Sequence, residues 1–308
     1  MRSKQLLING LLLVAAVLGF SSLALAGPYN GVVVYGDSLS DNGNLFNAIG
    51  YPPPPYYNGR FSNGIVAVEY LAQNLNVPLT DLAWGGATTG IGDIADGGTQ
   101  TKLGLLGLPG MTTTFLATVG NITPDMAANS LFMAWGGPDD FTSDGLSMMT
   151  ADRGVANLLN IVAGLKGVGV QHILVPGMPD LGLTPFYRDH GLGTIGSQLS
   201  AYFDSKLIGG LQGSGAIYFD TYSLLDDIVA HPAKYGFTNV TDPCFDGVNI
   251  CADPNDYLFW DDSHPTTYAH SLLGAYFTEV ATPEPASAVM FGTGLAGLFG
   301  VLRRRFHK

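Results

Sequence analysis

Three side chains that can cooperate in nucleophilic catalysis stand near opposite ends of the chain. Ser38 lies in the stretch GVVVYGDSLSDNGN, residues 31–44, whereas Asp261 and His264 stand three positions apart in FWDDSHPTTYAH, residues 259–270. An imidazole can take the proton of a serine hydroxyl that attacks a carbonyl, and a carboxylate can hold that imidazole in the required tautomer. A serine in such a turn can instead cap a helix, so the interpretation depends on whether the fold brings the three residues together.

The residues before Ser38 predict a short buried strand that ends in a sharp turn. Residues 32–34 are three valines, and Gly36 and Asp37 then interrupt the apolar run. In open α/β folds, ligands bind beside the carboxyl ends of the strands, where such a turn would place Ser38.

Four more apolar segments predict strands at residues 79–84, 131–135, 172–175 and 216–220. Helical patterns lie between several of them, at residues 65–74, 153–165 and 198–211. Strands that alternate with helices indicate a parallel sheet covered on both faces. The sequence therefore predicts an α/β fold, a three-layer α/β/α sandwich with a five-stranded parallel sheet.

Two blocks of this sequence resemble the GDSL (SGNH) family of serine esterases and lipases, in particular its secreted lipase and lecithinase-like branch. They are GDSLSDNGN at residues 36–44 and Asp261-x-x-His264 followed by Pro265. The resemblance covers residues 30–280 and implies a flavodoxin-like strand order. It makes Ser38 the nucleophile, His264 its base and Asp261 the acid that orients the base, with the backbone N–H groups of Ser38 and Gly86 in the oxyanion hole.

The implied activity is hydrolysis of carboxylic esters through an acyl-enzyme on Ser38. The substrates would be lipid esters, short acyl esters or acetyl groups on polysaccharide. The chemistry needs neither a metal nor a cofactor, and residues 27–282 would form the hydrolase domain.

Asp139 departs from the family pattern. The third block of the family reads Gly-x-Asn-Asp, and its Asn side chain donates a hydrogen bond to the oxyanion, but this chain has Asp139 in that place. An ionised carboxylate would repel an oxyanion, so we expect slow hydrolysis unless burial keeps Asp139 neutral or its side chain turns away. The alternative is a binding or extracellular-matrix protein that keeps the fold with weakened catalysis.

The loop YPPPPYYNGRFSNG, residues 51–64, is predicted to be extended because its prolines exclude a helix. Its aromatic side chains either line an acyl or sugar site or only pack the loop; they are Tyr51, Tyr56, Tyr57 and Phe61. Cys244 and Cys251 are the two cysteines of the chain. In an exported protein they are expected to form one short disulfide loop that braces the block at Asp261.

Both ends of the chain read as export signals. Residues 1–26 have basic residues before an apolar run and a small-residue cleavage site, as in a secretory signal peptide; a retained anchor is the alternative. Residues 283–308 combine Pro-Glu-Pro, an apolar run at 286–302 and a basic end. This order resembles the PEP-CTERM sorting signal of Gram-negative bacteria, cut by a sorting protease; an ordinary transmembrane anchor is the alternative.

The charge of the chain limits the partners that it can have. The net charge is −12, and the two ends carry six basic residues and one acidic residue, so the remaining body carries −17. Such a charge argues against a nucleic-acid partner and against an anionic membrane surface. It suits a soluble extracellular protein, and with the two end signals we expect a location outside the cell or at its surface, associated with exopolysaccharide.

Overall fold

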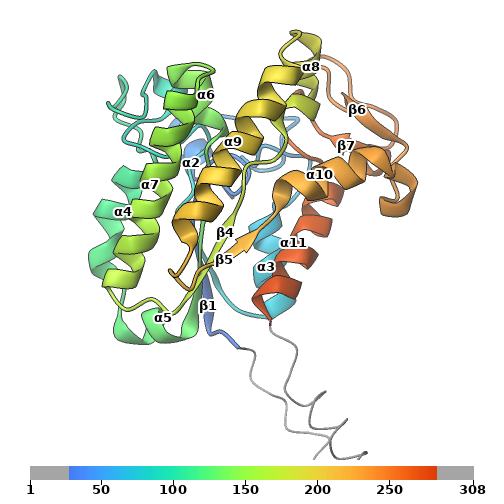
Figure 1. Ribbon diagram of the computed structural model, residues 1–308. Helices are drawn as coiled ribbons and strands as arrows, with labels where there is room; N and C mark the ends of the chain where they lie inside the picture. Colours follow the sequence, from blue (N-terminus) through green and yellow to red (C-terminus); the bar gives the residue numbers. More distant parts are fainter. Residues whose placement is uncertain (1–27, 283–308) are drawn as a thin grey trace, which may run out of the picture.

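Five short apolar segments pair into one parallel sheet, and the structure, a computed structural model, describes residues 28–282 around it (Figure 1). The strand order is β2-β1-β3-β4-β5, which confirms the predicted sheet and its flavodoxin-like order. The strands are β1 (Gly31–Gly36), β2 (Leu79–Asp81), β3 (Ser130–Trp135), β4 (His172–Pro176) and β5 (Ile217–Phe219). Strand β2 ends at Asp81, before the predicted position 84, although the N–H groups of Leu82 and Trp84 still donate to the carbonyls of Val34 and Gly36 of β1.

Helices cover both faces of the sheet, as Figure 1 shows. Val33 and Tyr35 of β1 point into a core shared with helices α4, α7 and α9, whereas Val32 and Val34 point into a core shared with α3 and α11. This alternation is the period of two that a strand imposes on its side chains. The covering helices are α3 (Ala67–Leu75), α4 (Met111–Thr118), α7 (Met148–Gly167), α9 (Gly193–Leu211) and α11 (Thr267–Ala281).

Helix α7 begins five residues earlier than the periodicity predicts. Ser147 caps it, because its hydroxyl accepts the N–H of Thr150. The remaining described α-helices are shorter and lie in the connections: α2 (Asn44–Ile49), α5 (Pro124–Asn129), α6 (Pro138–Asp144), α8 (Pro185–Asp189) and α10 (Thr221–Ala230).

A second, two-stranded sheet precedes the block at Asp261 and was not predicted. Its parallel strands are β6 (Asn239–Pro243) and β7 (Tyr257–Phe259), and the predicted disulfide between Cys244 and Cys251 closes a loop between them. The N–H of Cys244 donates to the carbonyl of Phe259, so the disulfide loop does brace the segment that leads to Asp261.

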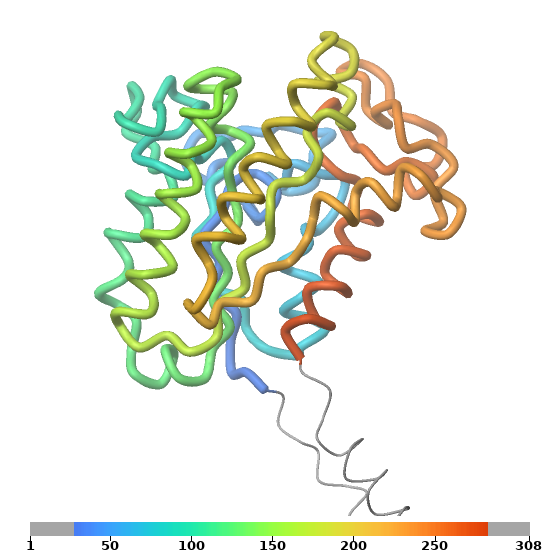
Figure 2. The backbone as a smooth tube through the Cα atoms, in the orientation of Figure 1, coloured from blue at the N-terminus to red at the C-terminus, as the bar shows by residue number. Residues whose placement is uncertain are grey.

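The register of the large sheet brings its functional loops together. Strand β1 pairs with β3 along its whole length, with Gly36 opposite Trp135, so the turns after these two strands leave the sheet side by side. In Figure 2 the first and last described segments, at the blue and red ends, lie at the opposite end of the strands, away from these loops.

No helix within residues 28–282 is long and apolar enough to cross a membrane. The predicted signal peptide and the predicted sorting signal with its apolar run lie outside the described residues.

Candidate active site

The structure brings Ser38, His264 and Asp261 into one hydrogen-bonded chain. His264 Nε2 lies 2.8 Å from Ser38 Oγ, and His264 Nδ1 lies 2.9 and 2.8 Å from the two carboxylate oxygens of Asp261. Ser38 and His264 are 226 positions apart, so only the tertiary fold can create this contact. In this geometry the imidazole can remove the hydroxyl proton while the carboxylate holds the other ring nitrogen.

Local backbone bonds fix each member of the triad. After β1 the chain makes a tight turn in which the carbonyl of Asp37 accepts the N–H groups of Ser40 and Asp41, so Ser38 lies at the carboxyl end of the strand. Asp261 Oδ1 accepts the backbone N–H of Ser263 at 2.8 Å and that of His264 at 2.6 Å. The orienting carboxylate thus also shapes the loop that carries the base.

The electrostatics of the triad suit proton transfer at near-neutral pH. Burial lowers the pKa of His264, but the charge and hydrogen bond of Asp261 outweigh this, so its pKa lies above the ordinary value. Burial also opposes the ionised form of Asp261, yet the contacts with His264 bring its pKa below the usual range. The pair therefore favours an ionised Asp261 and stabilises the imidazolium that forms when Ser38 is deprotonated.

Two backbone N–H groups are free to bind an oxyanion. Within residues 28–282, neither the N–H of Ser38 nor that of Gly86 donates to another group of the protein. Gly86 has φ +90° and occupies the third position of a turn closed by a bond from the N–H of Ala87 to the carbonyl of Trp84, as in a type II turn. The N–H of Trp84 donates to the carbonyl of Gly36, which fastens this turn beside the one that carries Ser38.

Asp41 joins the first two loops of the site through one buried carboxylate. It accepts the backbone N–H groups of Gly43, Asn44 and Leu45 at 2.6 to 3.1 Å, and that of Gly85 at 2.7 Å. Its side chain is fully buried. Sequence reasoning treated Asp41 only as part of a motif, although an acidic residue three positions after the serine and before Asn-Gly-Asn was a signal for such a role.

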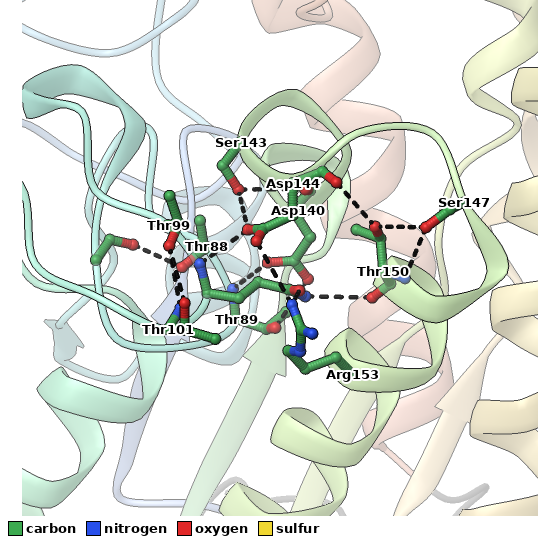
Figure 3. A network of polar contacts seen from close by, with 12 residues as sticks. Thr88, Thr89, Thr99, Thr101, Asp140, Ser143, Asp144, Ser147, Thr150 and Arg153 are labelled. Atoms are coloured by element: carbon green, nitrogen blue, oxygen red, sulfur yellow. Dashed lines mark hydrogen bonds and ion pairs between the residues drawn. The ribbon is translucent and has the colours of Figure 1, made fainter.

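Asp140 joins the second and third loops in the same way. Its carboxylate accepts the N–H and the hydroxyl of Thr89, each at 2.8 Å. Figure 3 shows this contact within a larger polar network, in which Arg153 of α7 contacts Asp144 of α6. The network anchors α6, and with it Asp139 at the start of that helix. Asp140 was not singled out from the sequence.

A cavity of about 350 Å³ lies beside Ser38 and His264. Asp139 contributes to its wall, as do Asp37 and side chains of α10, α11 and β7. Within residues 28–282, no group of three or more His, Cys, Asp or Glu side chains could hold a metal ion.

The family model described as GDSL-like Lipase/Acylhydrolase matches residues 32–277. The chain belongs to this family. The family's members are hydrolases that act on ester bonds.

Individual relatives cover most of the chain at low identity. The thermolabile hemolysin of Vibrio parahaemolyticus is 28% identical over 81% of this chain, and the match spans only 63% of the hemolysin's length. A GDSL esterase/lipase of Arabidopsis thaliana is 28% identical over 78% of this chain and 82% of its own. Among solved structures, a putative GDSL-like lipase from Parabacteroides merdae aligns with a TM-score of 0.48, 13% identity and coverage of 82% of this chain and 96% of its own.

The aromatic residues of the proline-rich loop are not in the wall of this cavity. Tyr51 and Tyr57 are 48% and 44% exposed. Phe61 packs its ring 5.0 Å from the ring of His264, and the hydroxyl of Tyr56 donates to Asp261 Oδ2 at 2.8 Å. The loop does lie at the active site, but Tyr56 and Phe61 contact the triad rather than the cavity.

Asp139 lies in the cavity wall near the nucleophile, as expected for the residue in the place of the family's Asn. Its Oδ2 is buried and has no hydrogen-bond partner within residues 28–282. Burial raises the pKa of Asp139 well above its ordinary value, and the nearby carboxylates of Asp37, Asp93 and Asp140 raise it further. A neutral carboxyl group has an O–H, so Asp139 can offer an oxyanion a donor in place of the Asn amide.

We expect Tyr56→Phe to lower kcat/KM for a simple ester by roughly tenfold, since a hydrogen bond to a charged group contributes on the order of 1.5–3 kcal/mol. Without the Tyr56 hydroxyl, Asp261 holds more negative charge toward His264, so the pKa of His264 should rise. The acid limb of the pH–rate profile should therefore move to higher pH. Tyr57→Phe, which alters an exposed side chain of the same loop, is the control. An unshifted acid limb in Tyr56→Phe would contradict this role.

The ionisation of Asp139 should control the pH dependence of hydrolysis. Because its pKa is raised, the carboxyl group is neutral below that pKa and charged above it, so wild-type activity should fall as pH rises through this range. Asp139→Asn should keep its activity there and exceed the wild type at high pH by roughly 100-fold or more, the usual effect of one oxyanion donor. On the acidic side the two proteins should differ little, until protonation of His264 stops both.

Asp139→Ala is the control, because it removes the donor at every pH without introducing a charge. It should be slow across the whole profile. Equal high-pH behaviour of the wild type and Asp139→Asn would mean that Asp139 does not face the oxyanion.

Proposed function

We propose that this protein is an exported serine esterase that hydrolyses carboxylic esters through an acyl-enzyme on Ser38. The observation that carries the proposal is the 2.8 Å contact between His264 Nε2 and Ser38 Oγ, with Asp261 on the other ring nitrogen. Membership of a family of ester hydrolases supports it, as do relatives that are themselves named esterase/lipases.

The proposed reaction has two similar halves. Ser38 Oγ attacks the ester carbonyl as its proton moves to His264 Nε2, and the carbonyl oxygen becomes an oxyanion held by the N–H groups of Ser38 and Gly86. The intermediate collapses when His264 returns the proton to the departing alcohol, which leaves an acyl group on Ser38. Water then repeats the attack with His264 as base, and the carboxylic acid leaves with Ser38 restored.

The triad geometry favours this function over a binding or matrix protein with weakened catalysis. A chain that had lost its activity would have no need to hold Ser38, His264 and Asp261 in hydrogen-bond contact. The alternative was based on repulsion between an ionised Asp139 and the oxyanion. The raised pKa of Asp139 argues against it, since a neutral carboxyl group does not repel an oxyanion.

We propose further that the protein acts outside the cytoplasm of a Gram-negative bacterium, at the cell surface or in its exopolysaccharide. The sequence of both ends supports this location, and the disulfide between Cys244 and Cys251 fits an oxidising compartment. A sorting protease that removes residues after the Pro-Glu-Pro motif would then be a partner.

Ser38→Ala should reduce hydrolysis of p-nitrophenyl butyrate by at least 10³-fold, since the nucleophile of the triad would be lost. A fluorophosphonate probe should label the wild type at Ser38, as located by peptide mass spectrometry, and should not label the variant. Ser40→Ala, which removes a buried hydroxyl two residues away, is the matched control and should retain labelling. Turnover that survives in Ser38→Ala would overturn the proposed mechanism.

Mass spectrometry of the protein from its native host should show a mature start at Gly27 and loss of the residues after Pro285, because both ends have the features of cleaved signals. The same measurement on protein made in a host without a sorting protease should show the carboxyl end intact. A native protein that retains Arg303 and Lys308 would instead have an ordinary anchor.

A further inference from the structure

The cavity beside Ser38 is much larger than an acetyl group requires. Its volume is about 350 Å³, in the range of small-molecule sites. A water-sized group, such as a methylene, occupies about 30 Å³, so the cavity has room for roughly ten such groups. The methyl of an acetyl ester would occupy about one of these places and would leave the rest of the cavity unfilled.

The wall of the cavity is apolar away from the catalytic residues. Its acidic and catalytic members come from the loops that carry Ser38, Asp139 and His264. The other wall residues are mostly aliphatic or aromatic and come from α10, α11, β7 and the segment around α8: Leu181, Phe186, Tyr187, Leu224, Leu225, Ile228, Leu258, Phe259, Ala269 and Leu273. The cavity therefore extends from the nucleophile into the apolar cluster between α10 and α11.

The wall contains three threonines, Thr142, Thr184 and Thr221, and the hydroxyls of the last two are already hydrogen-bonded to protein groups. Thr184 Oγ1 donates to the carbonyl of Leu181, and Thr221 Oγ1 donates to the carbonyl of Gly177, at 2.8 and 2.9 Å. Neither donor is free to bind a sugar hydroxyl. An apolar chain needs no such partner, and each buried methylene gains free energy by leaving water.

We propose that this cavity binds the acyl chain of the substrate and that the enzyme prefers medium-length acyl esters over acetyl esters. The inference rests on the proposed esterase function. The acyl group remains attached to Ser38 after the alcohol has left, so an apolar cavity beside Ser38 suits the acyl part, whereas the alcohol must depart.

The test measures kcat/KM of the full chain on p-nitrophenyl acetate, butyrate, octanoate, decanoate and palmitate. The value should rise by up to about fourfold for each added methylene until the cavity is filled, near octanoate or decanoate, and should fall for palmitate. A matched series of alkyl acetates, in which only the alcohol lengthens, should show no such rise. Acetate as the best acyl substrate, or a rise in the alcohol series alone, would overturn the proposal.

Leu225→Trp fills part of the cavity from α10 and should lower kcat/KM for decanoate at least tenfold while acetate changes less than threefold. Val229→Trp is the matched control, because Val229 lies on the same helix in the same apolar cluster but not in the cavity wall. An equal loss for all chain lengths in Leu225→Trp, with circular dichroism unchanged, would count against the cavity as the acyl site.

Failure of the esterase function is distinguishable from failure of this inference. The inactive Ser38→Ala variant should still bind methyl decanoate, measured by calorimetry, and Leu225→Trp added to it should abolish that binding. If the variant binds methyl decanoate and the wild type hydrolyses no ester, the proposed function is wrong while the cavity assignment stands. If the wild type hydrolyses acetate and the variant does not bind methyl decanoate, the cavity assignment is wrong.

Discussion

The buried carboxylate of Asp41 is the contact on which the geometry of the site depends. One side chain accepts four backbone N–H groups, three from the loop after Ser38 and one from Gly85. These four hydrogen bonds fix the orientation of the Asp41 carboxylate. They therefore also fix the position of the turn that carries Ser38 relative to the turn that carries Gly86. An oxyanion hole made of N–H groups from both turns requires this fixed relative position, because both donors must lie about 2.7–3.1 Å from a single oxygen.

The site as a whole is rich in buried acids, which is unusual for a reaction that develops negative charge. Burial raises the pKa of Asp37 to about 6 and those of Asp93 and Asp140 to about 7, and it raises that of Asp139 well above the ordinary value. Asp261 departs from this trend, because its contacts with His264 and with backbone N–H groups bring its pKa below the usual range. Ionised carboxylates beside the reacting carbonyl would repel the oxyanion. Desolvation favours the neutral form of several of these acids, whereas Asp261 of the triad stays ionised.

The loop at residues 51–64 and the disulfide loop support the triad from outside the main sheet. Tyr56 donates to Asp261, and its ring packs edge-on against Trp260 and Phe245. Phe245 follows Cys244 and donates its N–H to the carbonyl of Trp260. The acid of the triad therefore rests on an aromatic cluster that two loops, far apart in the sequence, build together.

The sequence by itself determined the fold class and located the residues that could carry the chemistry. Short apolar segments separated by helical patterns indicate a covered parallel sheet, and the blocks around Ser38 and around Asp261 and His264 carry the candidate reactive groups. These features are local, so they can be read from neighbouring residues. Only the tertiary structure decided which residues each of these side chains contacts. It put Tyr56 and Phe61 against the triad and not in the cavity, and it added the sheet of β6 and β7. It also placed other acidic side chains near Asp139 and formed the apolar cavity whose wall includes residues of α10 and α11. Burial, pairing and pKa depend on contacts between residues that are distant in the chain, and no local pattern encodes them.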